Sequence, residues 1–106
     1  MENLVASPFK LNETIGYQDG SVVSREILRK KTGTVTLFAF DKDQGLSEHT
    51  APFDATILCL DGELEATIEG TPMKVQEGEM LIMPADKPHS IKAVEKFKML
   101  LIMIRT

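Results

Sequence analysis

Few residues of this chain could do chemistry. Its 106 residues include two histidines, His49 and His89, one cysteine and six methionines. Neutral imidazole is the commonest metal ligand in proteins and also serves as a hydrogen-bond partner or base near neutral pH. A single histidine is more often a surface or hydrogen-bonded structural residue. Each of these two follows a turn at the start of a segment, so their chemistry depends on whether the fold brings them together.

The sulfur-containing residues have structural explanations. Cys59 lies in an apolar run with no basic residue before it to lower the pKa of its thiol, so we expect a buried structural cysteine rather than a nucleophile. Core filling by flexible thioethers explains the methionines better than a soft-metal set does. Met80, Met83, Met99 and Met103 are four of the six methionines that could resemble such a set.

The elements that must position these residues are strands. Residues 63–69 alternate strictly between polar and apolar side chains, which is typical of a half-buried strand. Residues 56–60 form an apolar run before them, and the intervening Asp61-Gly62 pair predicts a two-residue hairpin turn. Residues 34–40 are a strand by residue type. The long apolar segment 97–104 predicts a strand that is buried on both faces or covered by a partner.

Turn residues divide the rest of the chain into short runs. Pro- and Gly-containing turns separate apolar runs at 73–75, 80–83 and 89–94. Asp19-Gly20 is a second hairpin candidate, whereas residues 11–16 could be helix or strand. Eight or more short strands at regular spacing predict an all-β sandwich or jelly-roll barrel, because closure removes exposed strand edges.

Composition excludes several classes of protein. A hydrophobic fraction of 42% and a charged fraction of 26% are typical of a globular domain, and 106 residues suffice for one domain over residues 1–106. No apolar run can span a bilayer and the start lacks signal-peptide features, so we expect no membrane association. A net charge of −4 argues against nucleic acid as a partner. A single cysteine favours a reducing compartment, and we expect a cytoplasmic location.

The spacing after the first histidine resembles the first motif of the cupin family. That motif reads Gly, five residues, His-x-His, three or four residues, Glu, six residues, Gly. The segment from His49 to Gly62 follows this spacing.

The spacing before the second histidine resembles the second cupin motif, which reads Gly, five residues, Pro-x-Gly, two residues, His, three residues, Asn. Gly78, Pro84 and His89 follow it, and fifteen residues separate the two motifs, as in small cupins. The resemblance covers about residues 34–104. It implies a double-stranded β-helix, or jelly-roll barrel, preceded by an N-terminal arm over residues 1–16 that forms a short helix or a swapped strand.

Half of the implied metal ligands are absent. In the family, two histidines and a glutamate of the first motif join the histidine of the second to hold a divalent metal. His49 and His89 match the first and last of these positions, but Ala51 and Ala55 occupy the other two. We therefore expect no tightly bound cofactor. An Fe, Mn, Ni or Zn ion would need ligands from water, substrate or Asp54, which faces away unless a bulge turns it inward.

Other motif positions differ as well. Asp43 and Asp86 stand where the motifs have glycine, and Ala93 stands at the asparagine. Glu48 adjoins His49 and is expected to face away from it for the same reason as Asp54.

The two alanines at ligand positions should leave a pocket inside the barrel. Such a pocket, with both histidines at its wall, suits a small, largely apolar ligand with one or two polar atoms. In the alternative, Phe53 or the methionines fill the space. The expected lining is Ala51, Phe53, Ala55, Ile57, Cys59 and Ala93.

Two classes of function follow. The first is a small-molecule binding or sensing module whose metal centre is degraded. The second is a metal-dependent cupin enzyme, a dioxygenase or isomerase acting on a small metabolite through His49 and His89. A third class, a pure interaction module, has no feature in its favour.

The apolar content of the chain predicts a homodimer. Residues 97–104 together with Val22, Val23, Ile27 and Leu28 offer more apolar surface than the interior of one small barrel can absorb. The N-terminal arm could cross to the partner.

Overall fold

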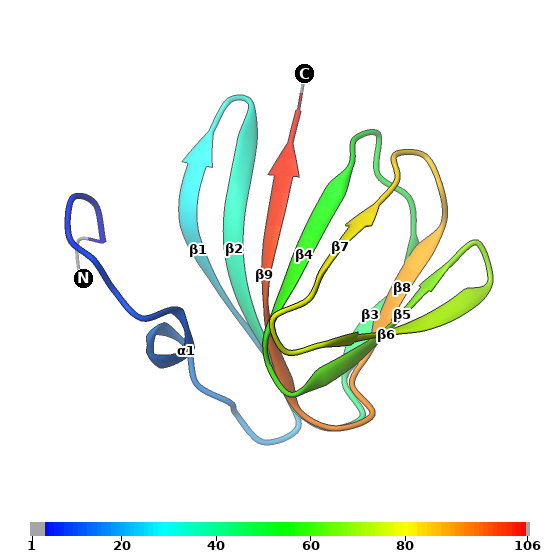
Figure 1. The fold of residues 1–106 in the computed structure, drawn as a ribbon, viewed down its shortest axis with the longest axis horizontal. Coiled ribbons are helices and arrows are strands. Elements are labelled where there is room, and N and C mark those ends of the chain that lie inside the picture. Colours follow the sequence, from blue (N-terminus) through cyan, green and yellow to red (C-terminus); the bar gives the residue numbers. More distant parts are fainter. Residues whose placement is uncertain (1–3, 106) are drawn as a thin grey trace.

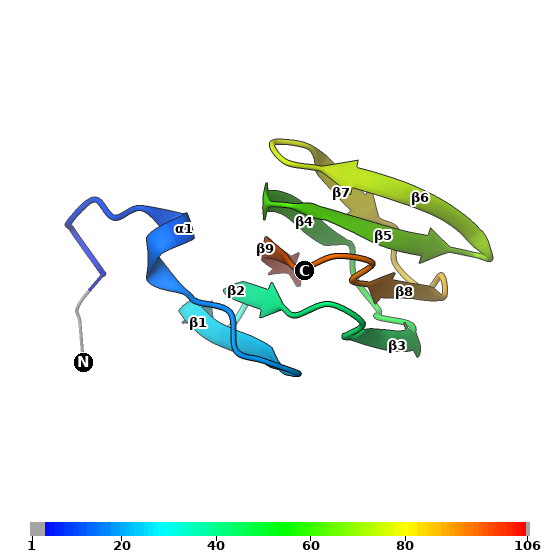
Figure 2. The same cartoon turned by 90° about the horizontal axis from the view of Figure 1, so that it is seen from below.

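Two antiparallel sheets face each other in the computed structural model, which describes residues 4–105. The larger sheet has the strand order β1-β2-β9-β4-β7 and the smaller one β3-β8-β5-β6, as Figures 1 and 2 show. The elements are α1 (Leu11–Thr14), β1 (Val22–Lys30), β2 (Gly33–Phe40), β3 (Gly45–His49), β4 (Ala55–Asp61), β5 (Glu63–Ile68), β6 (Thr71–Gln76), β7 (Met80–Met83), β8 (His89–Lys92) and β9 (Phe97–Ile104). The predicted all-β fold is confirmed.

The main core lies between the sheets. Period-two alternation turns every second side chain inward, and the two largest fully buried residues, Phe40 and Phe97, stack with ring centroids 4.6 Å apart. β9 lies centrally between β2 and β4, with Met99 buried on its inner face and Leu100 on its outer face. Burial on both faces, as predicted, holds for the first half of β9, whereas residues 101–103 are half-buried and Ile104 is exposed.

The N-terminal arm packs on the outer face of the larger sheet of its own chain. Ile15 joins Leu37, Ala39 and Leu100 in a second, smaller core, and the arm contains the one-turn helix α1. The Tyr17 hydroxyl donates to an Asp61 carboxylate oxygen over 2.5 Å. Of the two alternatives for the arm, the short helix is the one observed. The first three residues of the arm, 1–3, lie outside the described residues.

The predicted hairpin at Asp61-Gly62 is wrong. β4 pairs with β7 and β9 in one sheet, whereas β5 pairs with β6 and β8 in the other. Gly62 has a φ of +74°, and a Cβ there would collide with the carbonyl oxygen of Lys96. The glycine is therefore needed where the chain crosses tightly between sheets. An Asp-Gly pair predicts a sharp turn, but it does not predict whether the next strand pairs with the preceding one or joins the other sheet.

The two-residue hairpin occurs one strand later. Glu69 and Gly70 both have positive φ, +49° and +81°, and the flanking residues Ile68 and Thr71 pair directly. These are the angles of a type I′ turn, whose twist matches that of the flanking strands.

The second hairpin candidate, Asp19-Gly20, is also a turn without a hairpin. Among the described residues before it there is a helix but no strand. The Gly20 amide donates to the Asp41 carboxylate over 2.7 Å, which anchors the turn to the end of β2.

No helix within residues 4–105 is long and apolar enough to cross a membrane.

Candidate functional site

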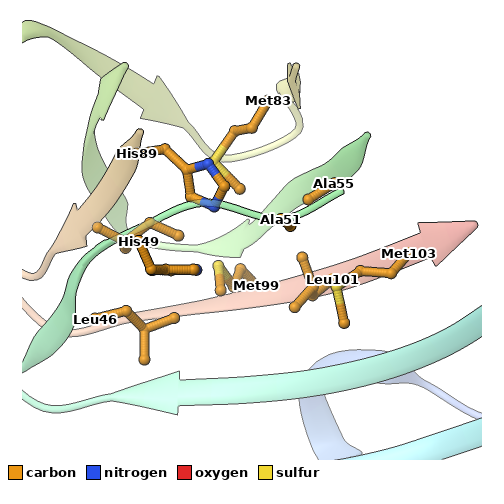
Figure 3. Close-up of a pocket in the computed structure, with 10 residues that line it drawn as sticks. Leu46, His49, Ala51, Ala55, Met83, His89, Met99, Leu101 and Met103 are labelled. Carbon is orange, nitrogen blue, oxygen red and sulfur yellow. The ribbon is translucent and has the colours of Figure 1, made fainter. Parts of the chain in front are cut away.

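The two histidines meet because their strands are neighbours. β3 ends at His49 and β8 begins at His89, and the antiparallel register places these residues opposite each other. Their ring centroids are 4.4 Å apart with the ring planes at 71°. Figure 3 shows both imidazoles projecting from the smaller sheet toward the larger one. Residues forty positions apart in sequence thus form one pair.

Backbone carbonyl groups fix the protonation pattern of both rings. His49 Nδ1 lies 2.7 Å from the Ser47 carbonyl oxygen, and His89 Nδ1 lies 3.2 Å from that of Lys87. A carbonyl oxygen only accepts hydrogen bonds, so each Nδ1 carries the hydrogen. In the neutral ring, Nε2 then keeps its lone pair. The same orientation is used by metal-ligating histidines, whose second nitrogen donates to a backbone carbonyl.

Burial keeps His89 neutral. Its side chain is 2% exposed, and this desolvation lowers the pKa of the imidazole, with a further lowering from the charge of His49. The carbonyl of Lys87 opposes the shift more weakly. Near pH 7 the buried ring is therefore a lone-pair donor and not a cation.

An apolar pocket opens beside the histidine pair. Apart from the two imidazoles, its walls are aliphatic or thioether groups. His49 is exposed and lies at the mouth, whereas His89 is buried. Water centres can occupy about 40 Å³ of the space, which is room for a few water molecules. The lining residues, drawn in Figure 3, are Leu46, His49, Ala51, Ala55, Met83, His89, Ile91, Met99, Leu101 and Met103.

Two of the six residues predicted to line the pocket do so. Ala55 begins β4 as expected, and Ala51 reaches the same space from the loop after β3 rather than from a strand. Ile57, Cys59 and Ala93 are buried in the core but do not line the pocket. Their side chains point inward as predicted. Along their strands, however, they lie one or two inward-facing positions deeper than the residues that line the pocket.

Phe53 lies elsewhere. It lines a separate surface hollow with Asp54 and Ile82, and the Arg105 guanidinium lies 5.3 Å from its ring centroid. The alternative in which Phe53 fills the barrel interior is therefore wrong. Residues that the sequence reasoning omitted, Leu46, Met83, Ile91, Met99, Leu101 and Met103, complete the walls. Period-two alternation along β9 groups Met99, Leu101 and Met103 on one face, and that signal was present in the sequence.

The donor set does not fit the divalent metal that the motif resemblance implies. Asp54 accepts a hydrogen bond from the Ala85 amide over 2.9 Å and does not line the pocket, and Glu48 is exposed. Within residues 4–105, no group of three or more His, Cys, Asp or Glu side chains is placed to hold a metal ion. Two imidazoles fall short of the three or four protein ligands of a catalytic site.

The backbone nevertheless follows both motifs. Gly62 and Gly78 have φ of +74° and +86°, and the two aspartates at the other glycine positions, Asp43 and Asp86, have +70° and +62°. Left-handed backbone is costly for most residues but tolerable for Asp. All four glycine positions of the motifs thus keep the conformation for which glycine is suited, although two of them carry a side chain.

Cys59 is not a second reactive centre. Its thiol lies 3.4 Å from the Gly62 carbonyl oxygen at the far end of β4. Burial raises the pKa of the thiol to about 11, so the thiolate is scarce near pH 7. This agrees with the prediction of a buried structural cysteine.

Comparison with known proteins places this geometry in a family. The model of the cupin domain matches residues 36–105. A conserved protein of unknown function from Streptococcus pyogenes is 32% identical, with a TM-score of 0.91 over 100% of this chain and 91% of that one. A cupin 2 conserved barrel domain protein from Leptotrichia buccalis is 40% identical, with a TM-score of 0.89, and covers 92% of this chain. The match spans 47% of that longer chain.

A third structure extends the likeness. A cupin superfamily protein from Desulfitobacterium hafniense is 27% identical, with a TM-score of 0.90 over 95% of this chain and 93% of that one. Comparison with curated proteins gave no match.

Proposed function

The chain belongs to the cupin family, and from that premise we propose that its barrel pocket binds a small, largely apolar molecule carrying at least one O–H or N–H group. The observation that carries the proposal is the imidazole pair on an otherwise apolar wall. His49 and His89 both use Nδ1 on backbone carbonyls, which leaves two Nε2 lone pairs for the pocket.

The lone pair of the buried His89 selects the ligand, because leaving it unpaired is costly, whereas water can satisfy the lone pair of the exposed His49. A buried acceptor without a donor is unfavourable, so a site built to accept a hydrogen bond rejects an analogue that cannot donate one. The remaining walls come from Ala, Leu, Ile and Met side chains, which favour an apolar body. A donor group on a compact hydrocarbon frame satisfies both requirements.

The size of the pocket limits the ligand and indicates how it enters. About 40 Å³ for water centres is small, but three methionines share the walls. Methionine side chains have three rotatable bonds and re-pack at low cost. We therefore expect entry past the exposed His49 with rearrangement of Met83, Met99 and Met103.

Methionine-methyl NMR tests the proposal with phenol and its hydrocarbon counterpart toluene as probes. Phenol should shift the methyl signals of Met83, Met99 and Met103 while leaving Met80, which is exposed on β7, unchanged. Toluene should bind at least about tenfold more weakly. Replacing His89 by leucine should remove the preference for phenol. Equal affinity for the two probes, or shifts confined to Met80, would contradict the proposal.

The alternative, a metal-dependent cupin enzyme, gains no support from the site. It would use His49 and His89 with ligands from elsewhere, and the described lining offers no carboxylate or thiol. Asp54, the side chain best placed in sequence to help, is engaged with the Ala85 amide.

We also propose that two copies pair through the outer face of the larger sheet. Met80, Ile82 and Ile104 point outward there and are 58%, 58% and 64% exposed. Val23 and Ile27, which the sequence predicts to contribute to an interface, instead pack with the arm of the same chain. Light scattering coupled to size-exclusion chromatography should give a molecular mass of twice 11.8 kDa at micromolar protein concentration. The double variant Ile82→Lys, Ile104→Lys should be monomeric, and a parent mass near 11.8 kDa throughout would contradict pairing.

A further inference from the structure

Three thioethers border the pocket in addition to filling the core. Met83, Met99 and Met103 all line the space that holds His49 and His89. Met83 and Met99 are 2% and 0% exposed, so their sulfur atoms are held away from bulk water. Figure 3 shows the side chains of these two methionines reaching toward the imidazoles from the opposite sheet.

Strand register ties the thioethers to the missing carboxylate. Ala55 stands where the family motif has glutamate, and it pairs with Met83 on β7 and with Met103 on β9. Directly paired residues on one face have Cβ atoms about 5 Å apart. The position that lacks a hard oxygen ligand is therefore flanked on both sides by soft sulfur ligands.

Ligand chemistry then indicates which ion the pocket suits. Thioether and neutral imidazole donors favour Cu(I), whereas Mg, Ca and Mn prefer the carboxylate and carbonyl oxygens that this lining lacks. Both imidazoles already have the orientation of metal ligands, with Nδ1 on a carbonyl and Nε2 free. An ion also needs far less room than an organic molecule, which matches the narrow space.

We infer that the pocket is a soft-metal site that binds one Cu(I) ion through Nε2 of His49 and His89 and the thioether sulfur atoms of Met83 and Met99. Met103 lies in the same pocket, on the far side of Ala55 from Met83. No redox step is involved, since the inference concerns binding of the reduced ion. It goes beyond the proposed binding of an organic molecule, and the two ligands would compete for the same lone pairs.

The experiment is an anaerobic titration of the purified protein with Cu(I), using bicinchoninate as the competing chelator. Cys59 must be replaced by alanine in every variant, because a thiol binds Cu(I) on its own. The Cys59→Ala protein should remove one equivalent of Cu(I) from the chelator. Zn²⁺ and Mn²⁺ should not displace it, and sulfur scatterers should appear in the copper X-ray absorption spectrum.

Matched methionine variants locate the site. Leu replaces Met with little change of volume, so folding should be retained and can be checked by circular dichroism. The pair Met83→Leu, Met99→Leu should weaken Cu(I) binding at least about tenfold. The control pair Met73→Leu, Met80→Leu, which lies outside the pocket, should leave it unchanged.

Two results would overturn the inference. One is loss of Cu(I) binding on replacing Cys59 alone, which would place the ion on the thiol. The other is equal affinity in the pocket pair and the control pair. Neither result affects the phenol and toluene comparison, so failure here is distinguishable from failure of the proposed function.

Discussion

The two ends of the barrel differ although β9 runs through both. At the closed end, Phe40 and Phe97 stack with ring planes 13° apart and are fully buried. At the open end, β4 contributes Ala55 and the loop before it contributes Ala51, and a pocket remains beside the histidine pair. β9 passes through both ends, from Phe97 to the half-buried Met103.

This difference in packing suggests that the closed end contributes mainly to stability and the open end to ligand recognition. Close-packed interiors tolerate few voids, and the stacked, fully buried rings of Phe40 and Phe97 fill the closed end. Small residues at the open end leave space, and three flexible methionines are among the side chains that border it. The fold thus concentrates its packing energy at one end and leaves the other free to accept a ligand.

Truncating one residue at each end should show the contrast most strongly. Phe97→Ala should lower the free energy of unfolding by about 3–5 kcal/mol, because it opens a cavity in a fully buried cluster. Met103→Ala should cost under about 2 kcal/mol, since its side chain is partly exposed and already borders a pocket. Urea unfolding of both variants is the measurement. Equal losses would mean that the two ends are packed alike.

Acidification should destabilise the open end through His89. Its folded-state pKa lies below the value of about 6.5 for free histidine, so the unfolded chain binds the proton more readily. The free energy of unfolding is then fully retained above about pH 6.5 and falls as the pH drops below it. His89→Gln should flatten the profile between pH 7.5 and 5.5. A parent protein whose stability is constant or rises over this interval would show that the ring is not desolvated.

The smallest effect should come from the left-handed backbone that follows β7. Asp86→Gly should stabilise the fold by about 0.5 kcal/mol because glycine adopts a φ of +62° without strain, partly offset by its greater freedom in the unfolded chain. The matched variant Asp86→Ala should instead cost about 1 kcal/mol. Thermal unfolding ranks the three proteins. If alanine is as stable as glycine, the conformation at Asp86 is different from the one described here.

Local patterns in the sequence predicted the strands and the pairing of the motifs. Alternation over residues 63–69 and the apolar run 97–104 both correspond to strands, and His49 meets His89 as the motif spacing implies. The destination of the chain after Asp61 was not predictable, because the same turn residues serve a hairpin and a crossing between sheets. Which sheet receives β5 is decided by long-range pairing with β8.

The depth of the pocket was the other unpredictable feature. Parity indicates that Ile57 and Cys59 face inward, and they do, but it does not say how far along a strand the large side chains begin to fill the interior. Phe40 and Phe97 close that region from β2 and β9. The alanines at ligand positions therefore marked the pocket more reliably than inward parity did.

The measurement that tests the central claim most directly is restoration of the family's ligand set. Ala51→His with Ala55→Glu places four ligands, three imidazoles and one carboxylate, around one pocket if His49, Ala51, Ala55 and His89 converge as described. Without metal, the added polar groups should cost about 1–3 kcal/mol for each one left unsatisfied. Binding of Mn²⁺, Ni²⁺ or Zn²⁺ to the folded state alone should raise the melting temperature again.

Thermal unfolding with and without each metal should compare the parent, the double variant and a control carrying Ala51→His with Ala55→Gln, which lacks the carboxylate. The account predicts a metal-dependent rise in melting temperature that is large in the double variant, smaller in the control and absent from the parent. A folded double variant that shows no such rise would mean that the four positions do not converge on one site.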